Sequence, residues 1–227
     1  VLNKTNILIT CGLNDDWEFE KSFFKKKPTT QITAFDHTIN QDFWIKRFKK
    51  DIISFLLLRK LRIIKILDIF KYINYRLFFL KNKKHYIKKI VFKKKNEKEI
   101  TIPKILENYE KVFLKIDIEG DEYKILNDIK KNSKKIIFLV IEFHDLHKNI
   151  HKIKKFLKGL DLKIIHIHAN NYGGIDEYSN PKVIELSLLN TKKIKVNNVF
   201  SKRKYPIVNL DYKNFKRRDE IKIKFNE

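Results

Sequence analysis

The sequence contains a single cysteine, five glycines, four prolines and no methionine among its 227 residues. Cys11 cannot form a disulfide within the chain or build a zinc site of several cysteines, so we expect a reducing, intracellular setting. The scarcity of glycine and proline excludes a collagen-like or linker-rich chain. Since 43% of the residues are apolar and 13% aromatic, the chain can fill a hydrophobic core, and overall disorder is excluded.

The N-terminus lacks the features of a secretory leader. The chain opens on Val1 and reaches the apolar segment 6–11 without a charged region followed by a long apolar one. We therefore predict a cytoplasmic protein without a signal peptide, and whether residues precede Val1 stays open.

Arginine is scarce, although Lys+Arg 51 against Asp+Glu 27 give a formal net charge of +24. A positive surplus attracts nucleic acid or anionic lipid. Base readout and bidentate phosphate binding favour arginine, however, and only seven of the 51 cationic residues are arginines. We therefore predict that nucleic acid is not the partner and that the scattered lysines form a solvated surface.

Long uncharged apolar runs are absent as well. Within residues 51–81 the longest apolar run is near 52–58, and Arg59, Lys60 and Arg62 follow it. A transmembrane helix needs about 20 nearly uncharged residues, so we predict no membrane span. Two interpretations remain for this segment, a helix packed on the sheet and a basic amphipathic helix in peripheral contact with anionic lipid.

Apolar periodicity predicts strands that alternate with helices. The predicted strands cover residues 6–11, 31–36, 85–92, 112–117, 135–143, 162–168 and 183–189. The predicted helices lie near residues 17–24, 41–80, 101–109, 121–129 and 149–160. This alternation indicates an α/β fold with a doubly wound, mostly parallel sheet, and the last two strands indicate a terminal antiparallel hairpin. We predict a domain over 1–190 with a long helical insert at 41–82, followed by a basic extension over 191–227.

Polar residues follow the first two predicted strands, at the edge where open α/β sheets bind ligands. A lone glycine, Gly12, is followed by Asp16 and Glu20, which does not match the three-glycine dinucleotide fingerprint. Carboxylates there disfavour a pyrophosphate and favour a cationic or neutral ligand, but they also suit helix capping. Asp36 ends the second strand 24 residues after Gly12, where nucleotide-type folds hold a ribose, although a turn aspartate would look the same.

The later strand ends are also polar. Asp117 and Glu119 precede Gly120, and so many neighbouring acids suit a helix cap, a metal or a polar ligand. Glu142 and His144 lie two residues apart and therefore share one face of an extended segment, as catalytic groups or as a structural pair.

These motifs together resemble the FkbM-type S-adenosylmethionine-dependent methyltransferases over about residues 7–190. The matching patterns are G-x-x-x-D-x-x-F-E from Gly12, A-F-D ending at Asp36, L-K-I-D-I-E-G-x-E from Leu114, I-E-F-H ending at His144, and H-x-H-x-N-N-Y from His166. The resemblance implies a class I methyltransferase fold (Rossmann-like) that binds S-adenosylmethionine at the carboxyl edge of the sheet. On this resemblance the cofactor-binding residues are Gly12, Asp16, Glu20, Asp36, Asp117 and Gly120.

The resemblance also implies a reaction, the O-methylation of a hydroxyl on a saccharide or related small molecule. His168 or His144 would accept the hydroxyl proton, because an imidazole titrates near neutral pH. Asp117 and Glu119 are further catalytic candidates that would position the acceptor or a divalent metal, and no metal ligand is assigned. The predicted substrate-binding residues are Glu142, His166, Asn170 and Asn171. Two alternatives stay open: an RNA methyltransferase that uses the lysine-rich surface, and a non-catalytic methyltransferase-like module that docks on membranes.

Overall fold

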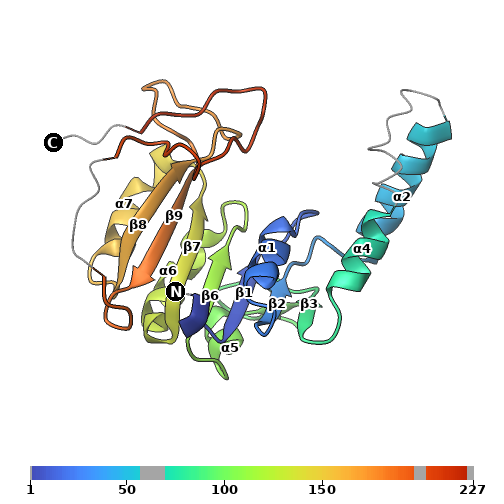
Figure 1. Cartoon of the computed structure of the whole chain (residues 1–227), viewed down its shortest axis with the longest axis horizontal. Helices are drawn as coiled ribbons and strands as arrows, with labels where there is room; N and C mark the ends of the chain where they lie inside the picture. Colours follow the sequence, from blue (N-terminus) through green and yellow to red (C-terminus); the bar gives the residue numbers. More distant parts are fainter. Residues whose placement is uncertain (1, 57–69, 197–202, 224–227) are drawn as a thin grey trace.

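A computed structural model describes residues 2–56, 70–196 and 203–223 of the chain. A seven-stranded sheet runs through its centre in the order β3-β2-β1-β6-β7-β9-β8 (Figure 1). Its strands are β1 (Ile7–Cys11), β2 (Gln31–Phe35), β3 (Lys83–Tyr86), β6 (Val112–Ile116), β7 (Ile136–Phe143), β8 (Leu162–Ala169) and β9 (Ile184–Asn190). All neighbours from β3 to β7 pair in parallel, whereas β9 pairs antiparallel with both β7 and β8. The expected doubly wound sheet with an antiparallel pair at its end is confirmed.

Helices cover both faces of this sheet. They are α1 (Glu18–Lys26), α2 (Gln41–Leu56), α4 (Lys71–Phe78), α5 (Ile102–Leu106), α6 (Glu122–Lys131) and α7 (Leu146–Leu157). Short 3-10 turns lie at η1 (Leu2–Lys4) and η2 (Ser133–Lys135). No helix in the described ranges has the length and apolar character that a membrane crossing requires.

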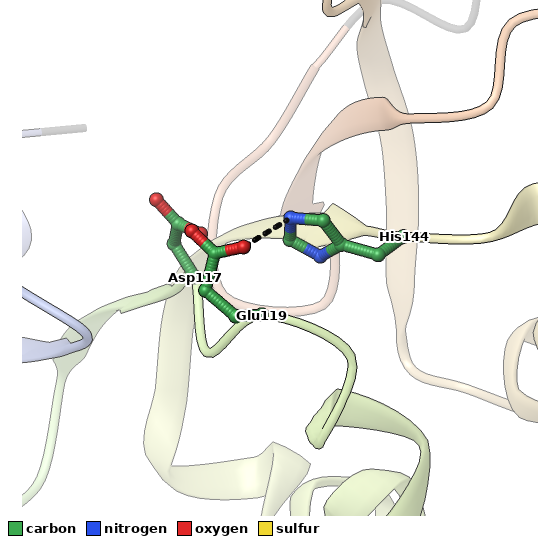
Figure 2. A group of neighbouring side chains, drawn as sticks. All are labelled: Asp117, Glu119 and His144. Atoms are coloured by element: carbon green, nitrogen blue, oxygen red, sulfur yellow. Dashed lines mark ion pairs between the residues drawn. The ribbon is translucent and has the colours of Figure 1, made fainter. Parts of the chain in front are cut away.

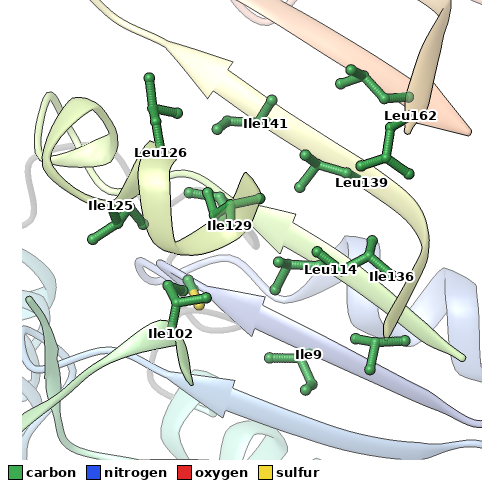
Figure 3. Packing of buried hydrophobic residues seen from close by; sticks show 14 of the residues in the cluster. Ile9, Ile102, Leu114, Ile125, Leu126, Ile129, Ile136, Leu139, Ile141 and Leu162 are labelled. Carbon is green, nitrogen blue, oxygen red and sulfur yellow. The ribbon is translucent and has the colours of Figure 1, made fainter. Parts of the chain in front are cut away.

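The main core lies between the sheet and α5, α6 and α7. Figure 3 shows Ile125 and Ile129 of α6 lying against Ile9, Leu114 and Leu139 of the strands. All five side chains are at most 1% exposed, and full burial of such a side chain contributes about 1.5–3 kcal/mol. The apolar periodicity predicted for α6 therefore identifies the face of the helix that packs on the sheet.

The opposite face of the sheet is covered less evenly. Phe23 of α1 packs against Leu8 and Phe113, but further along the sheet Phe138 and Val140 of β7 are only partly buried. The nearly continuous apolar run at 135–143 predicts a central strand that is covered on both faces. In β7 the cover is complete only on the face that packs against α5, α6 and α7.

The prediction of one strand over residues 85–92 is wrong in position. β3 ends at Tyr86, and the apolar residues beyond it belong to β4 (Lys89–Ile90), which pairs in parallel with β5 (Glu99–Ile100). Ile90 is 5% exposed and packs in the main core. The run is therefore apolar because of β4, whereas β3 is an edge strand that tolerates lysines.

Within the predicted insert at 41–82, α2 and α4 are helical, and residues 57–69 between them lie outside the described ranges. The two helices form an arm that projects beyond β3, far from β8 (Figure 1). The arm is tied to the domain by an aromatic cluster in which Trp44 and Tyr75 pack on Trp17.

Candidate functional site

Gly12 marks the point where three strand ends converge. Its N–H donates to the carbonyl of Phe35 at 2.9 Å, and the N–H of Asp117 donates to the carbonyl of Cys11 at 2.8 Å. Gly12 has φ +86°, and a Cβ there would lie 1.6 Å from the carbonyl oxygen of Asp117. The glycine is therefore required because the backbones of β1 and β6 approach closely at this turn.

Asp36 organises the same turn from the end of β2. Its Oδ2 accepts the N–H groups of Leu13 and Asn14, both at 2.8 Å, and its Oδ1 accepts the N–H of Thr38 at 2.7 Å and the hydroxyl of Thr38 at 2.6 Å. Burial raises the pKa of Asp36, but these hydrogen bonds outweigh it and hold the pKa below its ordinary value. The carboxylate thus stays charged and holds the turn after β1, while its predicted contact with a ribose stays a prediction.

The acids that follow Gly12 have different surroundings. Asp16 lies one residue before Trp17, the N-cap of α1, and accepts the N–H of Glu18, the first residue of the helix, at 2.9 Å, so it satisfies one N–H group at the helix start. Glu20 is 0% exposed, and its carboxylate oxygens have no well-formed hydrogen bond among the described residues. Burial raises the pKa of Glu20, whereas the nearby charge of Lys115, its own N–H and the hydroxyl of Thr10 lie near enough to lower it. A buried carboxylate without hydrogen-bond partners is costly unless a proton or a bound ligand compensates for it.

Glu122 joins the loop after β6 to the end of β7. It is fully buried, and its carboxylate accepts the N–H of Gly120 at 2.7 Å and the N–H of His144 at 2.8 Å. Gly120 has φ +94°, so glycine lets the loop turn back toward this carboxylate. The predicted cofactor residue Gly120 therefore has a clear structural role, and Glu122 is a site residue that the sequence analysis left out of its assignment.

Carboxylates surround the imidazole of His144. Its Nε2 lies 3.2 Å from Glu142 Oε1 and 3.6 Å from Glu119 Oε2, and its Nδ1 lies 3.3 Å from Glu122 Oε1. Burial lowers the pKa of His144, but the hydrogen bonds to Glu122 and Glu142 raise it to about 10. The residue is therefore an imidazolium at neutral pH, and the expected shared face of Glu142 and His144 is confirmed.

Asp117 completes this cluster at the end of β6. Burial, followed by the charge of Glu142, raises the pKa of Asp117 to about 6. Figure 2 shows the Glu119 carboxylate directed at the His144 ring with Asp117 beside Glu119, and one possible ligand atom from each of the three residues lies within 4.8 Å of the others. A single cation could contact all three, but it would have to displace the proton that the carboxylates hold on His144.

The two histidines of β8 face a different set of residues. His168 is 7% exposed, and its Nδ1 lies 3.7 Å from Glu185 Oε2 while its Nε2 lies 3.4 Å from Glu220 Oε2. Burial lowers the pKa of His168, but its hydrogen bonds to these two carboxylates raise it to about 9. His166 pairs with Asp211 at 2.6 Å. Both imidazoles therefore contact residues 203–223, which pass over the ends of β8 and β9 (Figure 1).

The two asparagines after β8 point to different partners. Asn170 donates to Glu142 Oε1 at 3.2 Å and so joins the cluster around His144. Asn171 is 1% exposed, donates to the carbonyls of Phe215 and Arg218 at 3.0 Å each, and accepts the N–H of Phe215 at 2.8 Å. Asn171 therefore anchors the C-terminal segment.

The predicted catalytic and substrate-binding residues thus form two groups. Asp117, Glu119, Glu142, His144 and Asn170 meet at the carboxyl edge of β6 and β7, whereas His166, His168 and Asn171 bind the C-terminal segment. Glu185 connects them, because it lies opposite Glu142 on one side and His168 on the other. Periodicity in the last predicted strand could have identified Glu185, but no sequence signal indicated Asp211 or Glu220.

The chain matches a known protein family over part of its length. A family model described as "Methyltransferase FkbM domain" matches residues 70–197, which is more than half of the chain and excludes Gly12 and Asp36. The comparison with curated proteins gave no match.

Two solved structures are similar at low identity. One is the precorrin-6Y C5,15-methyltransferase of Geobacter metallireducens GS-15, with 13% identity over 83% of this chain and 85% of that chain and a TM-score of 0.42. Another is the fibrillarin pre-rRNA processing protein of Methanococcus jannaschii, with 8% identity over 83% of this chain and 67% of that chain and a TM-score of 0.38. Both similarities are too weak to bear on the substrate or partners of this chain.

Proposed function

The chain belongs to the family of methyltransferases with an FkbM domain, and we propose that it transfers the methyl group of S-adenosylmethionine to a hydroxyl of a saccharide or related small molecule. The observation that supports this most is the position of Asp117. It follows β6 beside the Gly12 turn, at the edge where open α/β sheets bind ligands, and its pKa lies near neutrality.

The chemistry of this edge suits a cationic cofactor. When bound, S-adenosylmethionine supplies a methyl group on a positively charged sulfur, together with an ammonium group. Asp36 and Asp117 carry negative charge close to the Gly12 turn, and Glu20 is a buried carboxylate without a well-formed hydrogen bond among the described residues, although the Thr10 hydroxyl and the Lys115 charge lie near it. An ammonium group would supply the hydrogen bonds that Glu20 lacks, so we assign Glu20 to the methionine part. Asp36 would reach a ribose only by sharing oxygens that already accept two hydrogen bonds each.

We assign the role of proton acceptor to Asp117. His144 and His168 were the first candidates, but their pKa values of about 10 and about 9 make them cations at neutral pH. A general base must be unprotonated and near its substrate, and Asp117 meets the first condition above about pH 6. Bound S-adenosylmethionine would supply the methyl group and leave as S-adenosylhomocysteine, and an Asp117 carboxylate oxygen would accept the proton that the acceptor hydroxyl loses.

The neighbours of Asp117 would orient the acceptor. The His144 imidazolium stabilises the charged form of Asp117, and Glu142 helps to keep His144 protonated. Glu119 is 79% exposed at its side chain, so it is accessible to a hydroxyl-rich acceptor that approaches from solvent. Asn170 fixes one oxygen of Glu142 through its hydrogen bond.

The test is transfer of labelled methyl groups from S-adenosylmethionine to carbohydrate fractions and to total RNA. We expect incorporation into carbohydrate, and Asp117→Asn should reduce turnover by about 100-fold or more while S-adenosylhomocysteine affinity stays nearly unchanged. Asp161→Asn is the matched control, because Asp161 pairs with Lys192 on the surface and should behave as wild type.

Other outcomes would favour the alternatives. Incorporation into RNA alone would replace the proposal with an RNA methyltransferase that uses the lysine-rich surface. Absence of thermal stabilisation by S-adenosylmethionine would indicate a module without a cofactor site, because a ligand that binds the native state stabilises it.

A further inference from the structure

The arm formed by α2 and α4 carries exposed apolar side chains on its outer surface. On α4 and its flanks these are Phe70, Ile73, Leu77 and Leu80, which are 49%, 50%, 63% and 48% exposed. The spacing of three and four residues puts Phe70, Ile73 and Leu77 on one face of α4, and Leu80 follows two residues after the helix ends. An apolar stripe on a helix is normally buried against another surface. Among the described residues, no surface buries this one.

The first helix of the arm has a similar stripe. Ile45, Phe48 and Ile53 are 44%, 50% and 55% exposed, and Ile52 is partly buried between them along the helix. Trp44 packs in the cluster that holds the arm to the domain, and Phe48, four residues later on the same side of α2, is 50% exposed. Both helices of the arm therefore carry buried or half-buried aromatic side chains that contact the domain and further apolar side chains that are exposed.

Other side chains of the two helices have partners, either in the other helix or in the domain. Trp44 packs against Tyr72 and Tyr75 with ring centroids 5.3 Å and 4.9 Å apart, which joins the two helices. Lys71 and Arg47 pair with Asp15 in the turn after β1. The position of the arm is therefore set by contacts that leave its outer stripes free of any structural role in the described chain.

Cationic residues lie beside the outer stripes. Lys46, Lys49 and Lys50 of α2 and Arg76 of α4 are all exposed. Lysine and arginine next to an apolar stripe can place their aliphatic parts along it and extend their charges outward. This combination is typical of helices that lie in the interface of an anionic bilayer.

We propose that the arm docks on the surface of an anionic membrane. The whole chain carries a net charge of +24, which adds long-range attraction to negative lipid headgroups. A second copy of the chain fits this surface poorly, because it would bring the lysines of one arm against those of the other. A nucleic acid would satisfy the lysines but would leave the apolar stripes without a partner. Docking does not depend on the proposed methyl transfer, since it uses none of the residues assigned to that reaction.

The experiment is co-sedimentation of the whole chain with two kinds of vesicle, phosphatidylcholine alone and phosphatidylcholine mixed with phosphatidylglycerol. We expect binding to the mixed vesicles that weakens with added salt, and little binding to the neutral ones. The double substitution Ile73→Asp with Leu77→Asp should reduce binding by about tenfold or more. Tyr178→Asp with Val208→Asp is the control, because these side chains are 77% and 83% exposed outside the arm.

A variant with reversed charges tests the proposal independently of the variant in the apolar stripe. Lys46→Glu with Lys49→Glu should weaken binding to the mixed vesicles by about tenfold, whereas Lys154→Glu with Lys155→Glu on α7 should weaken it much less. Equal binding to neutral vesicles, or equal losses in arm and control variants, would overturn the proposal. A concentration-dependent dimer in light scattering that the arm variants abolish would replace the membrane with a second copy.

Discussion

Replacing Asp36 with asparagine should destabilise the fold by about 3 kcal/mol. The aspartate is 6% exposed and accepts four hydrogen bonds, two at each carboxylate oxygen. An amide of the same shape has one oxygen, so its NH₂ group must face two donors on one side. Hydrogen bonds to a charged group contribute about 1.5–3 kcal/mol each, and water at the sheet edge replaces part of what is lost.

Urea unfolding measures this loss directly. The midpoint of Asp36→Asn should fall with little change in slope, because the substitution leaves the buried area almost unchanged. The depressed pKa of Asp36 means that its stabilisation is present above the ordinary aspartate pKa and is lost as the pH falls through the folded value. The difference between wild type and variant should therefore shrink in acid.

Asp176→Asn is the matched control for this prediction. Asp176 also accepts loop N–H groups, from Tyr178 at 2.9 Å and Asn180 at 2.8 Å, but its loop is exposed to water. Its substitution should cost clearly less stability. Equal losses at the two positions would refute the reasoning that burial and convergence at the sheet edge make Asp36 important.

Three further predictions concern the turn, the base and the C-terminal segment. Gly12→Ala should lower the melting temperature strongly, since its Cβ would lie 1.6 Å from a backbone oxygen at φ +86°; an unchanged melting curve would contradict the close approach. If Asp117 is the base, kcat/KM should rise with pH through about 6, and Asp117→Asn should remove that limb from the residual activity. His168 stabilises the fold fully below its ordinary pKa of 6.5 and loses this effect as pH rises through about 9. The protection of amides in residues 203–223, measured relative to their intrinsic exchange rates, should therefore fall over that range in the wild type but not in His168→Gln.

Predictions from the sequence were most accurate where a property depends on a single helix or strand. The apolar faces of α6 and β7 follow from periodicity, and they lie at the predicted places. The pairing of Glu142 with His144 also follows locally, because alternate residues of a strand share a face. The first half of the edge strand β3 escaped detection because it consists of Lys83 and Lys84, and the neighbouring apolar run belongs to β4.

The partners of the candidate catalytic groups could not be predicted in the same way. His168 meets Glu220, which is 52 residues away in a segment without clear periodicity, so its protonation could not be inferred from its own strand. The near-neutral pKa of Asp117 depends on burial and on Glu142 of a different strand. Such properties arise from contacts between distant segments, and local patterns do not record them.

A crystal structure of the protein with S-adenosylhomocysteine would test the central claim most directly. Our account predicts that the ligand lies at the carboxyl edge of β1 and β6, with its sulfur near Asp117 and its amino group close to Glu20. A ligand bound elsewhere on the chain, or crystals that take up none at saturating concentration, would contradict the assignment of this edge as the site of methyl transfer.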